Sequence, residues 1–140
     1  MDKQHPYNIF IGHAWHHRGV YGRVLQMLYD APYFYWKNCS NPHKGVYGLF
    51  ISGILKKKIV DQIAPANIVI MSTDVYNEKP DWGSFEIREA VRQGKPIITL
   101  ESHEKNVAVP EVLAENSNVV IPINEFRLVA AINDHVRLTV

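Results

Sequence analysis

Short apolar runs alternate with helical patterns along this sequence. Apolar and β-branched runs predict buried strands at residues 7–12, 67–71, 95–100 and 119–121, and an aromatic run predicts one more strand at residues 33–36. Apolar runs without polar alternation are typical of strands that are covered on both faces of a sheet.

Helical spacing separates these runs. Tyr21, Val24, Leu25 and Leu28 recur at positions i, i+3, i+4 and i+7, which predicts one buried helical face that ends before Pro32. Further helices are predicted over residues 49–63, from an Asp81 N-cap to Gly94, and over residues 111–116 and 125–136. Polar, turn-forming segments predict loops at residues 38–48 and 72–81.

This alternation predicts an α/β domain of the flavodoxin-like kind, with a parallel five-stranded sheet and helices on both faces. The chain has 140 residues, 46% of them hydrophobic, which is ordinary for one domain with a sizeable core. No internal repeat, low-complexity tract or linker divides the sequence, so residues 1–140 are predicted to form a single domain.

Charge and cysteine content exclude several classes of function. The formal net charge of +1 gives no electrostatic basis for binding nucleic acid or an acidic membrane surface. Cys39 is the only cysteine, so neither an intrachain disulfide nor a Cys-x-x-Cys site can form. His13, His16 and His17 lack a companion carboxylate or cysteine on the same face, and we expect no bound metal. The absence of a signal-peptide pattern and of a long apolar run predicts a cytoplasmic protein.

Ligands of open parallel sheets bind beyond the carboxyl ends of the strands. These ends are predicted at residues 12–15, 38–40, 72–74 and 101–103, and we expect the first three to converge. Gly12, His13, Asn38, Ser40 and Tyr76 are therefore candidate ligand contacts. Asn38, Ser40 and Tyr76 are equally well explained as loop or packing residues.

Several familiar α/β motifs are absent. The chain has no Gly-x-Gly-x-x-Gly after its first strand and no P-loop, which excludes the usual Rossmann and nucleotide triphosphate sites. It also lacks the Gly-x-Ser-x-Gly elbow of serine hydrolases.

Glu86 is the candidate chemical centre. Helical spacing places it near the carboxyl edge of the sheet, beside a buried stripe of Ile87, Ala90 and Val91 and one turn after Trp82. A carboxylate there can bind ribose hydroxyls or stabilise an oxocarbenium ion as a glycosidic bond breaks. A glutamate near a helix start also complements the helix dipole, and the pattern by itself favours this structural role.

Residues 7–15 resemble the opening strand and loop of TIR-like domains. That family usually has Phe-Ile-Ser-His-Ser-Trp where this chain has residues 10–15, with Gly12 and Ala14 in place of the two serines. The similarity continues in order at Tyr21, Leu25, residues 31–42, residues 62–67, Tyr76, Trp82, Glu86, Ile87, Ala90 and residues 94–98. Within the family, the sequence is most similar to bacterial TIR-like proteins of the ThsB type, from Thoeris antiphage defence.

This resemblance implies an NAD-cleaving enzyme. Such proteins break the nicotinamide–ribose bond, as a hydrolase or cyclase, and release an ADP-ribose-derived signal, expected here to be cyclic, that activates a partner effector. Glu86 matches the family's catalytic glutamate, four residues after Trp82. NAD is then a substrate and no cofactor is needed; a phage-derived trigger and a homo-oligomer are further expected partners. The substrate-binding residues implied are Gly12, His13, Asn38, Ser40, Tyr76 and Trp82.

Two other functions remain open from the sequence. One is a non-catalytic TIR-like interaction module, which the altered loop at Gly12 and Ala14 keeps in consideration. The other is an enzyme similar to nucleoside deoxyribosyltransferases, which also combine an α/β sheet with a glutamate.

Overall fold

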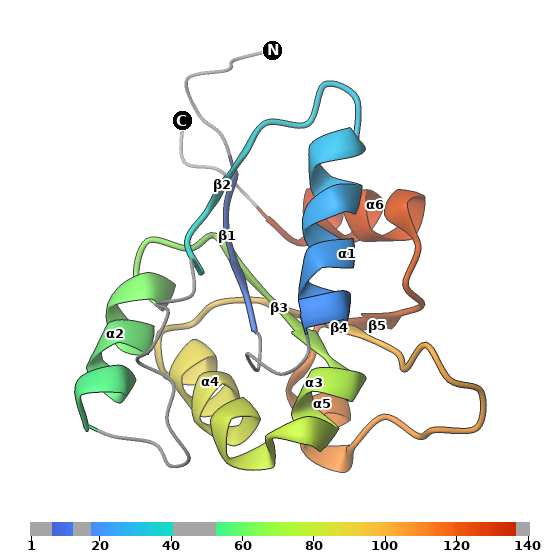
Figure 1. Ribbon diagram of the computed structural model, residues 1–140. Coiled ribbons are helices and arrows are strands. Elements are labelled where there is room, and N and C mark those ends of the chain that lie inside the picture. The colour runs from blue at the N-terminus through green and yellow to red at the C-terminus, as the bar shows by residue number, and fades with distance from the viewer. Residues whose placement is uncertain (1–6, 13–17, 41–52, 137–140) are drawn as a thin grey trace.

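The computed structural model describes residues 7–12, 18–40 and 53–136. They contain one parallel five-stranded sheet in the order β2-β1-β3-β4-β5, which is the flavodoxin-like order, so the predicted fold class is confirmed (Figure 1). The strands are β1 (Tyr7–Ile11), β2 (Trp36–Asn38), β3 (Ile68–Ser72), β4 (Ile97–Leu100) and β5 (Val119–Ile121). The helices are α1 (Arg18–Asp30), α2 (Gly53–Ile63), α3 (Thr73–Glu78), α4 (Pro80–Arg92), α5 (Glu111–Asn116) and α6 (Glu125–His135).

Two apolar clusters cover the two faces of the sheet. Helices α1 and α6 pack on one face, and α2, α4 and α5 pack on the other (Figure 1). The side chains of β1 divide between them: Ile9 and Ile11 join the first cluster and Phe10 joins the second. All residues of the central strand β3 are buried, which explains its uninterrupted apolar sequence. Within the described ranges, no helix is both long enough and apolar enough to cross a membrane.

The aromatic strand expected at residues 33–36 is wrong in its position. Tyr33 has a φ of +59° and its side chain is 84% exposed, so the chain turns there and β2 begins only at Trp36. The aromatic residues pack around this turn: the rings of Tyr7 and Phe34 stack with centroids 5.3 Å apart. The aromatic residues at 33–36 pack at the edge of the sheet and do not mark the extent of a strand.

The loop expected at residues 72–81 is also wrong, because α3 occupies most of it. Ser72 is the N-cap of α3, and its hydroxyl accepts a hydrogen bond from the backbone N–H of Val75 at 3.2 Å. Lys79 both ends α3 and caps α4, whose first residue is Pro80. Asp81 is therefore a first-turn residue and not the predicted N-cap. Proline is well suited to that first position, where its missing N–H has no intrahelical partner to lose.

The buried face of α4 differs from the predicted one. Val91 is 52% exposed, whereas Trp82, Glu86 and Ile87 are all buried. Glu86 thus lies within the buried stripe and not beside it. A Cβ atom at Gly83 would lie 2.5 Å from Cδ2 of Tyr76, so the glycine lets the Tyr76 ring of α3 rest against α4.

Replacing Ser72 by alanine should weaken α3. The substitution removes the side-chain acceptor for the Val75 N–H, which costs about 1 kcal/mol for a helix cap of this kind. We expect lower stability in urea and faster amide hydrogen exchange within α3. Asn124→Ala, which removes the equivalent cap of α6, is the matched control and should leave exchange in α3 unchanged. Unchanged α3 exchange in Ser72→Ala would contradict the assigned capping role.

Candidate functional site

The Glu86 carboxyl group is enclosed inside the protein. The side chain is 2% exposed, and Oε1 has no hydrogen-bond partner among the described residues. A buried polar atom without a partner costs about 1–3 kcal/mol relative to one that is satisfied.

Burial raises the pKa of Glu86 well above its usual value. The cause is desolvation, which disfavours the charged form of a carboxyl group in an apolar environment. Such a shift at the edge of a parallel sheet is a common property of chemically active carboxylates.

Glu89, on the same helix, provides a contrast. It is 6% exposed, but Arg92 donates to both of its carboxylate oxygens and Gln93 donates to Oε2 at 2.6 Å. The hydrogen bonds from Arg92 hold the pKa of Glu89 below its usual value, against the opposing effect of burial. Glu89 is a satisfied structural carboxylate, and Glu86 is not.

Gly12 lies directly against the Glu86 carboxyl group. A Cβ atom on Gly12 would be 3.0 Å from Oε1 of Glu86 and 2.7 Å from the sulfur of Met71. The backbone is held in this position because the Gly12 N–H donates to the carbonyl of Ile70 at 2.8 Å, extending the pairing of β1 with β3. The structure therefore brings together two predicted site residues, Gly12 and Glu86.

Tyr76 and Trp82 lie at the packing of α3 against α4. The Tyr76 hydroxyl is 3.3 Å from the hydroxyl of Ser84, and its ring lies against Gly83. Trp82 is 6% exposed within the apolar cluster of that face of the sheet. Tyr76 therefore packs α3 against α4, and Trp82 is part of the buried apolar core.

Asn38 and Ser40 form a local network after β2. The amide oxygen of Asn38 accepts hydrogen bonds from the backbone N–H and the hydroxyl of Ser40, at 2.8 and 2.6 Å. Its amide nitrogen donates to the hydroxyl of Tyr21 on α1 at 2.9 Å. These contacts fix the end of β2 against α1. His13, also a predicted contact, lies outside the described residues.

A second polar cluster, which the sequence analysis missed, joins the ends of β3 and β4. The Asp74 carboxylate accepts hydrogen bonds from the Ser102 hydroxyl at 2.5 Å, from the His103 backbone N–H at 3.1 Å and from His103 Nδ1 at 2.6 Å. Burial alone would raise the pKa of Asp74, but the hydrogen bonds from His103 and Ser102 outweigh it and hold that pKa below its usual value. The signal in the sequence for this cluster was that Asp74 follows β3 and that Ser102 and His103 follow β4, which are neighbouring strands in the sheet.

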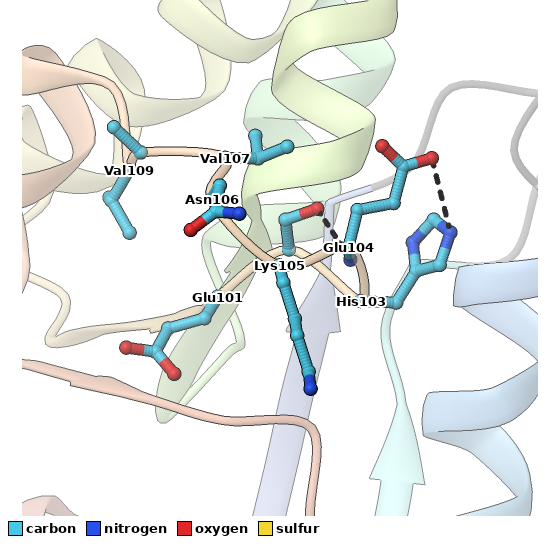
Figure 2. A pocket seen from close by; sticks show the side chains of 9 residues that line it. Glu101, His103, Glu104, Lys105, Asn106, Val107 and Val109 are labelled. Atoms are coloured by element: carbon cyan, nitrogen blue, oxygen red, sulfur yellow. Dashed lines mark hydrogen bonds and ion pairs between the residues drawn. The ribbon is translucent and has the colours of Figure 1, made fainter.

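The loop after β4 borders an open pocket of about 400 Å³, lined by residues 101–109 (Figure 2). His103, Glu104 and Lys105 are part of its lining. Among the residues that the structure describes, no group of three or more histidine, cysteine, aspartate or glutamate side chains is arranged to hold a metal ion.

Comparison with known proteins relates this chain to others through its fold. No protein-family model matches the sequence, and no curated protein matches it. A conserved protein from Enterococcus faecalis V583 superposes with a TM-score of 0.62 and 12% identity, over 92% of this chain and 98% of that one. A de novo designed Rossmann 2x3 protein superposes with a TM-score of 0.51 and 15% identity, over 91% of this chain and 86% of the designed one. Clostridium botulinum CMP N-glycosidase superposes with a TM-score of 0.49 and 17% identity, over 92% of this chain and 99% of the glycosidase. At these identities the likeness concerns the fold alone.

Glu86 should make the stability of the protein depend on pH. Because its pKa is raised in the folded state, its contribution to stability is fully present below the ordinary glutamate range and is lost as pH rises through the folded-state pKa. The loss amounts to at most about 1.4 kcal/mol per pH unit for one group. Urea unfolding of the wild type and Glu86→Gln at several pH values isolates the contribution of Glu86 to the free energy of unfolding, because the pKa shifts of Asp74 and Glu89 are common to both proteins. Parallel stability curves would contradict the assignment.

Adding a methyl group at Gly12 should disturb the Glu86 site. Gly12→Ala forces Met71 and the Glu86 carboxyl group to move, and overpacking of this kind costs about 1–3 kcal/mol. The cost should decrease in a Met71→Ala background, where the sulfur is absent. Gly22→Ala on α1 is the control, because its Cβ would meet nothing within 4 Å. Equal stability changes for the two glycine substitutions, measured by urea unfolding, would refute the close contact.

Proposed function

We propose that this protein cleaves the N-glycosidic bond of a nucleotide, with NAD as the substrate and Glu86 as the catalytic carboxylate. The observation that carries the proposal is a carboxyl group at 2% exposure whose Oε1 lacks a hydrogen-bond partner within the described part of the chain. Buried polar groups without hydrogen-bond partners are common at active sites, where a residue is retained for its chemistry although it lowers stability. The contact with Gly12 puts this group at the sheet edge where α/β domains bind ligands.

The chemistry requires a negative charge beside the ribose. The nicotinamide ring of NAD is cationic, so it leaves without being protonated. As the bond between ribose C1′ and the ring nitrogen breaks, its electron pair moves to the ring and positive charge develops on the ribose. Ionised Glu86 stabilises that charge, and the exclusion of water strengthens the attraction. Attack by water at C1′ then gives ADP-ribose and a proton, whereas attack by a group of the same molecule gives a cyclic product.

Protonation of Glu86 links substrate binding to pH. With its pKa raised by burial, the carboxyl group is neutral over part of the pH range in which an ordinary glutamate is ionised. A cationic nicotinamide ring favours the ionised form, so substrate binding and proton loss from Glu86 are coupled. We therefore expect kcat/KM to increase with pH until Glu86 is ionised.

Substrate access requires movement of the side chains around Glu86. Oε1 has almost no exposed surface, and Met71, which is fully buried, lies at the same contact with Gly12. Methionine is unbranched and adopts new rotamers easily, so its thioether end can move without rearranging β3. A requirement for such opening fits an enzyme that is inactive until an infection signal reaches it.

The resemblance to TIR-like domains supports NAD as the substrate and a role in antiphage signalling, in which the product activates an effector. A non-catalytic interaction module is less well supported, because an apolar residue in place of Glu86 would make its core more stable. A deoxyribosyltransferase-like enzyme would instead cleave 2′-deoxynucleosides, which gives a direct way to distinguish it.

The central prediction is that Glu86→Gln removes NAD cleavage. The amide keeps the size of the side chain but cannot carry the negative charge, so we expect kcat to decrease about 100-fold or more. Nicotinamide release and new nucleotides are followed by mass spectrometry, with NAD alone and with lysate from phage-infected cells added. A 2′-deoxynucleoside is included as an alternative substrate.

Glu89→Gln is the matched control. It changes a buried glutamate on the same helix whose carboxylate is already paired with Arg92, so stability should decrease while the turnover of folded enzyme is retained. NAD cleavage that survives in Glu86→Gln would refute the catalytic role. Continued inactivity of the wild type in infected lysate would favour the interaction module, and cleavage of the deoxynucleoside alone would favour the transferase.

A further inference from the structure

The hydrogen bonds of Asp74 fix the orientation of His103. Nδ1 of His103 is 2.6 Å from Oδ2 of Asp74, and the His103 backbone N–H also binds that carboxylate, so both the ring and the loop are held. Asp74 is 9% exposed, whereas the His103 side chain is 50% exposed. A buried carboxylate therefore holds a histidine whose other ring nitrogen, Nε2, is turned away from it.

Nε2 of His103 faces the carboxylate of Glu104. The distance to Oε1 of Glu104 is 3.8 Å, which is an ion-pair contact when the ring is protonated but is too long for a hydrogen bond (Figure 2). The Glu104 side chain is 67% exposed and belongs to the same loop. The open pocket of about 400 Å³ on this loop is within the size range of small-molecule sites, and Lys105 adds a second cationic side chain to its lining.

The charges around His103 favour its protonated form. The hydrogen bond and the charge of Asp74 raise the pKa of His103, and Glu104 adds a smaller effect in the same direction. Desolvation and the positive charge of Arg23 on α1 act against it. When the ring is protonated, Nε2 is an N–H donor with a positive charge, which suits an anionic ligand group.

His103 and the glycine that contacts Glu86 lie at the ends of different strands. Gly12 follows β1 and His103 follows β4, and β3 lies between these two strands. Two strand spacings correspond to about 10 Å between the two strand ends. The same separation lies within the length of a single dinucleotide, whose phosphate groups are next to its sugars.

We propose that His103, held by Asp74, binds a phosphate group of the nucleotide substrate. The proposal rests on the nucleotide-cleaving function proposed above and adds its anion-binding residue. His103 contacts the phosphate, and Asp74 is a positioning residue that orients the ring and keeps it cationic. Glu104 opposes binding, because its carboxylate repels the phosphate.

Binding of inorganic pyrophosphate tests the proposal without catalysis. Histidine ring signals are recorded by NMR at constant pH, and the signal of His103 is identified among the 7 histidines by its absence in His103→Gln. We expect pyrophosphate and ADP-ribose to shift the His103 signal, and nicotinamide riboside, which lacks phosphate, to leave it unchanged. Glu86→Gln should retain the shift, since Glu86 does not contact the phosphate.

Three substitutions should change phosphate affinity in opposite directions. His103→Gln and Asp74→Asn should weaken pyrophosphate binding about tenfold, and in Asp74→Asn the measured pKa of His103 should also decrease. Glu104→Gln should strengthen binding about two- to fivefold. In active enzyme the same changes should appear in KM for NAD, with kcat retained. A merely structural role for the cluster does not predict strengthening by Glu104→Gln.

The outcomes separate this proposal from the function proposed for Glu86. A pyrophosphate-dependent shift of His103 in a protein that never cleaves NAD would support the phosphate site and count against the proposed reaction. NAD cleavage by an enzyme whose His103 signal does not shift, and whose KM is unchanged in His103→Gln, would overturn the phosphate site alone. An equal shift with nicotinamide riboside would also overturn it.

Discussion

The contact between the Gly12 backbone and the Glu86 carboxyl group is the constraint on which the candidate site depends. Pairing of β1 with β3 holds Gly12 in place through its N–H bond to Ile70, and a side chain at this position would collide with Met71 and crowd Glu86. The side chain is buried, and Oε1 receives no hydrogen bond from the described residues. Desolvation by this burial raises the pKa of Glu86.

One helix carries two buried glutamates that have opposite electrostatic properties. Glu89 is stabilised by Arg92 and Gln93 and remains ionised, while Glu86 has no comparable partner within the described ranges and is held toward its neutral form. Burial alone therefore does not distinguish a structural carboxylate from a reactive one. The difference lies in which hydrogen-bond donors the surrounding residues supply.

The parallel sheet places the Glu86 site and the Asp74–His103 cluster at the same edge. β1, β3 and β4 are paired in parallel, so their carboxyl ends lie at the same edge of the sheet (Figure 1). Glu86 approaches this edge from α4, and His103 is brought to it by the loop after β4, where Asp74 fixes it. Gly12, which contacts Glu86, and His103 thus follow strands that are two positions apart in the sheet.

The sequence by itself determined the fold class, because uninterrupted apolar runs between helical patterns suit only buried parallel strands flanked by helices. It also pointed to Gly12 and Glu86, through position at a strand end and through resemblance. It did not reveal α3, since residues typical of turns concealed a helix whose N-terminus depends on the Ser72 hydroxyl. Only the tertiary structure decided that Glu86 is buried without a partner at Oε1 and that Asp74 meets His103. Both features depend on how elements distant in sequence are packed together. Strand order and helix packing determine that arrangement, and the local sequence pattern does not.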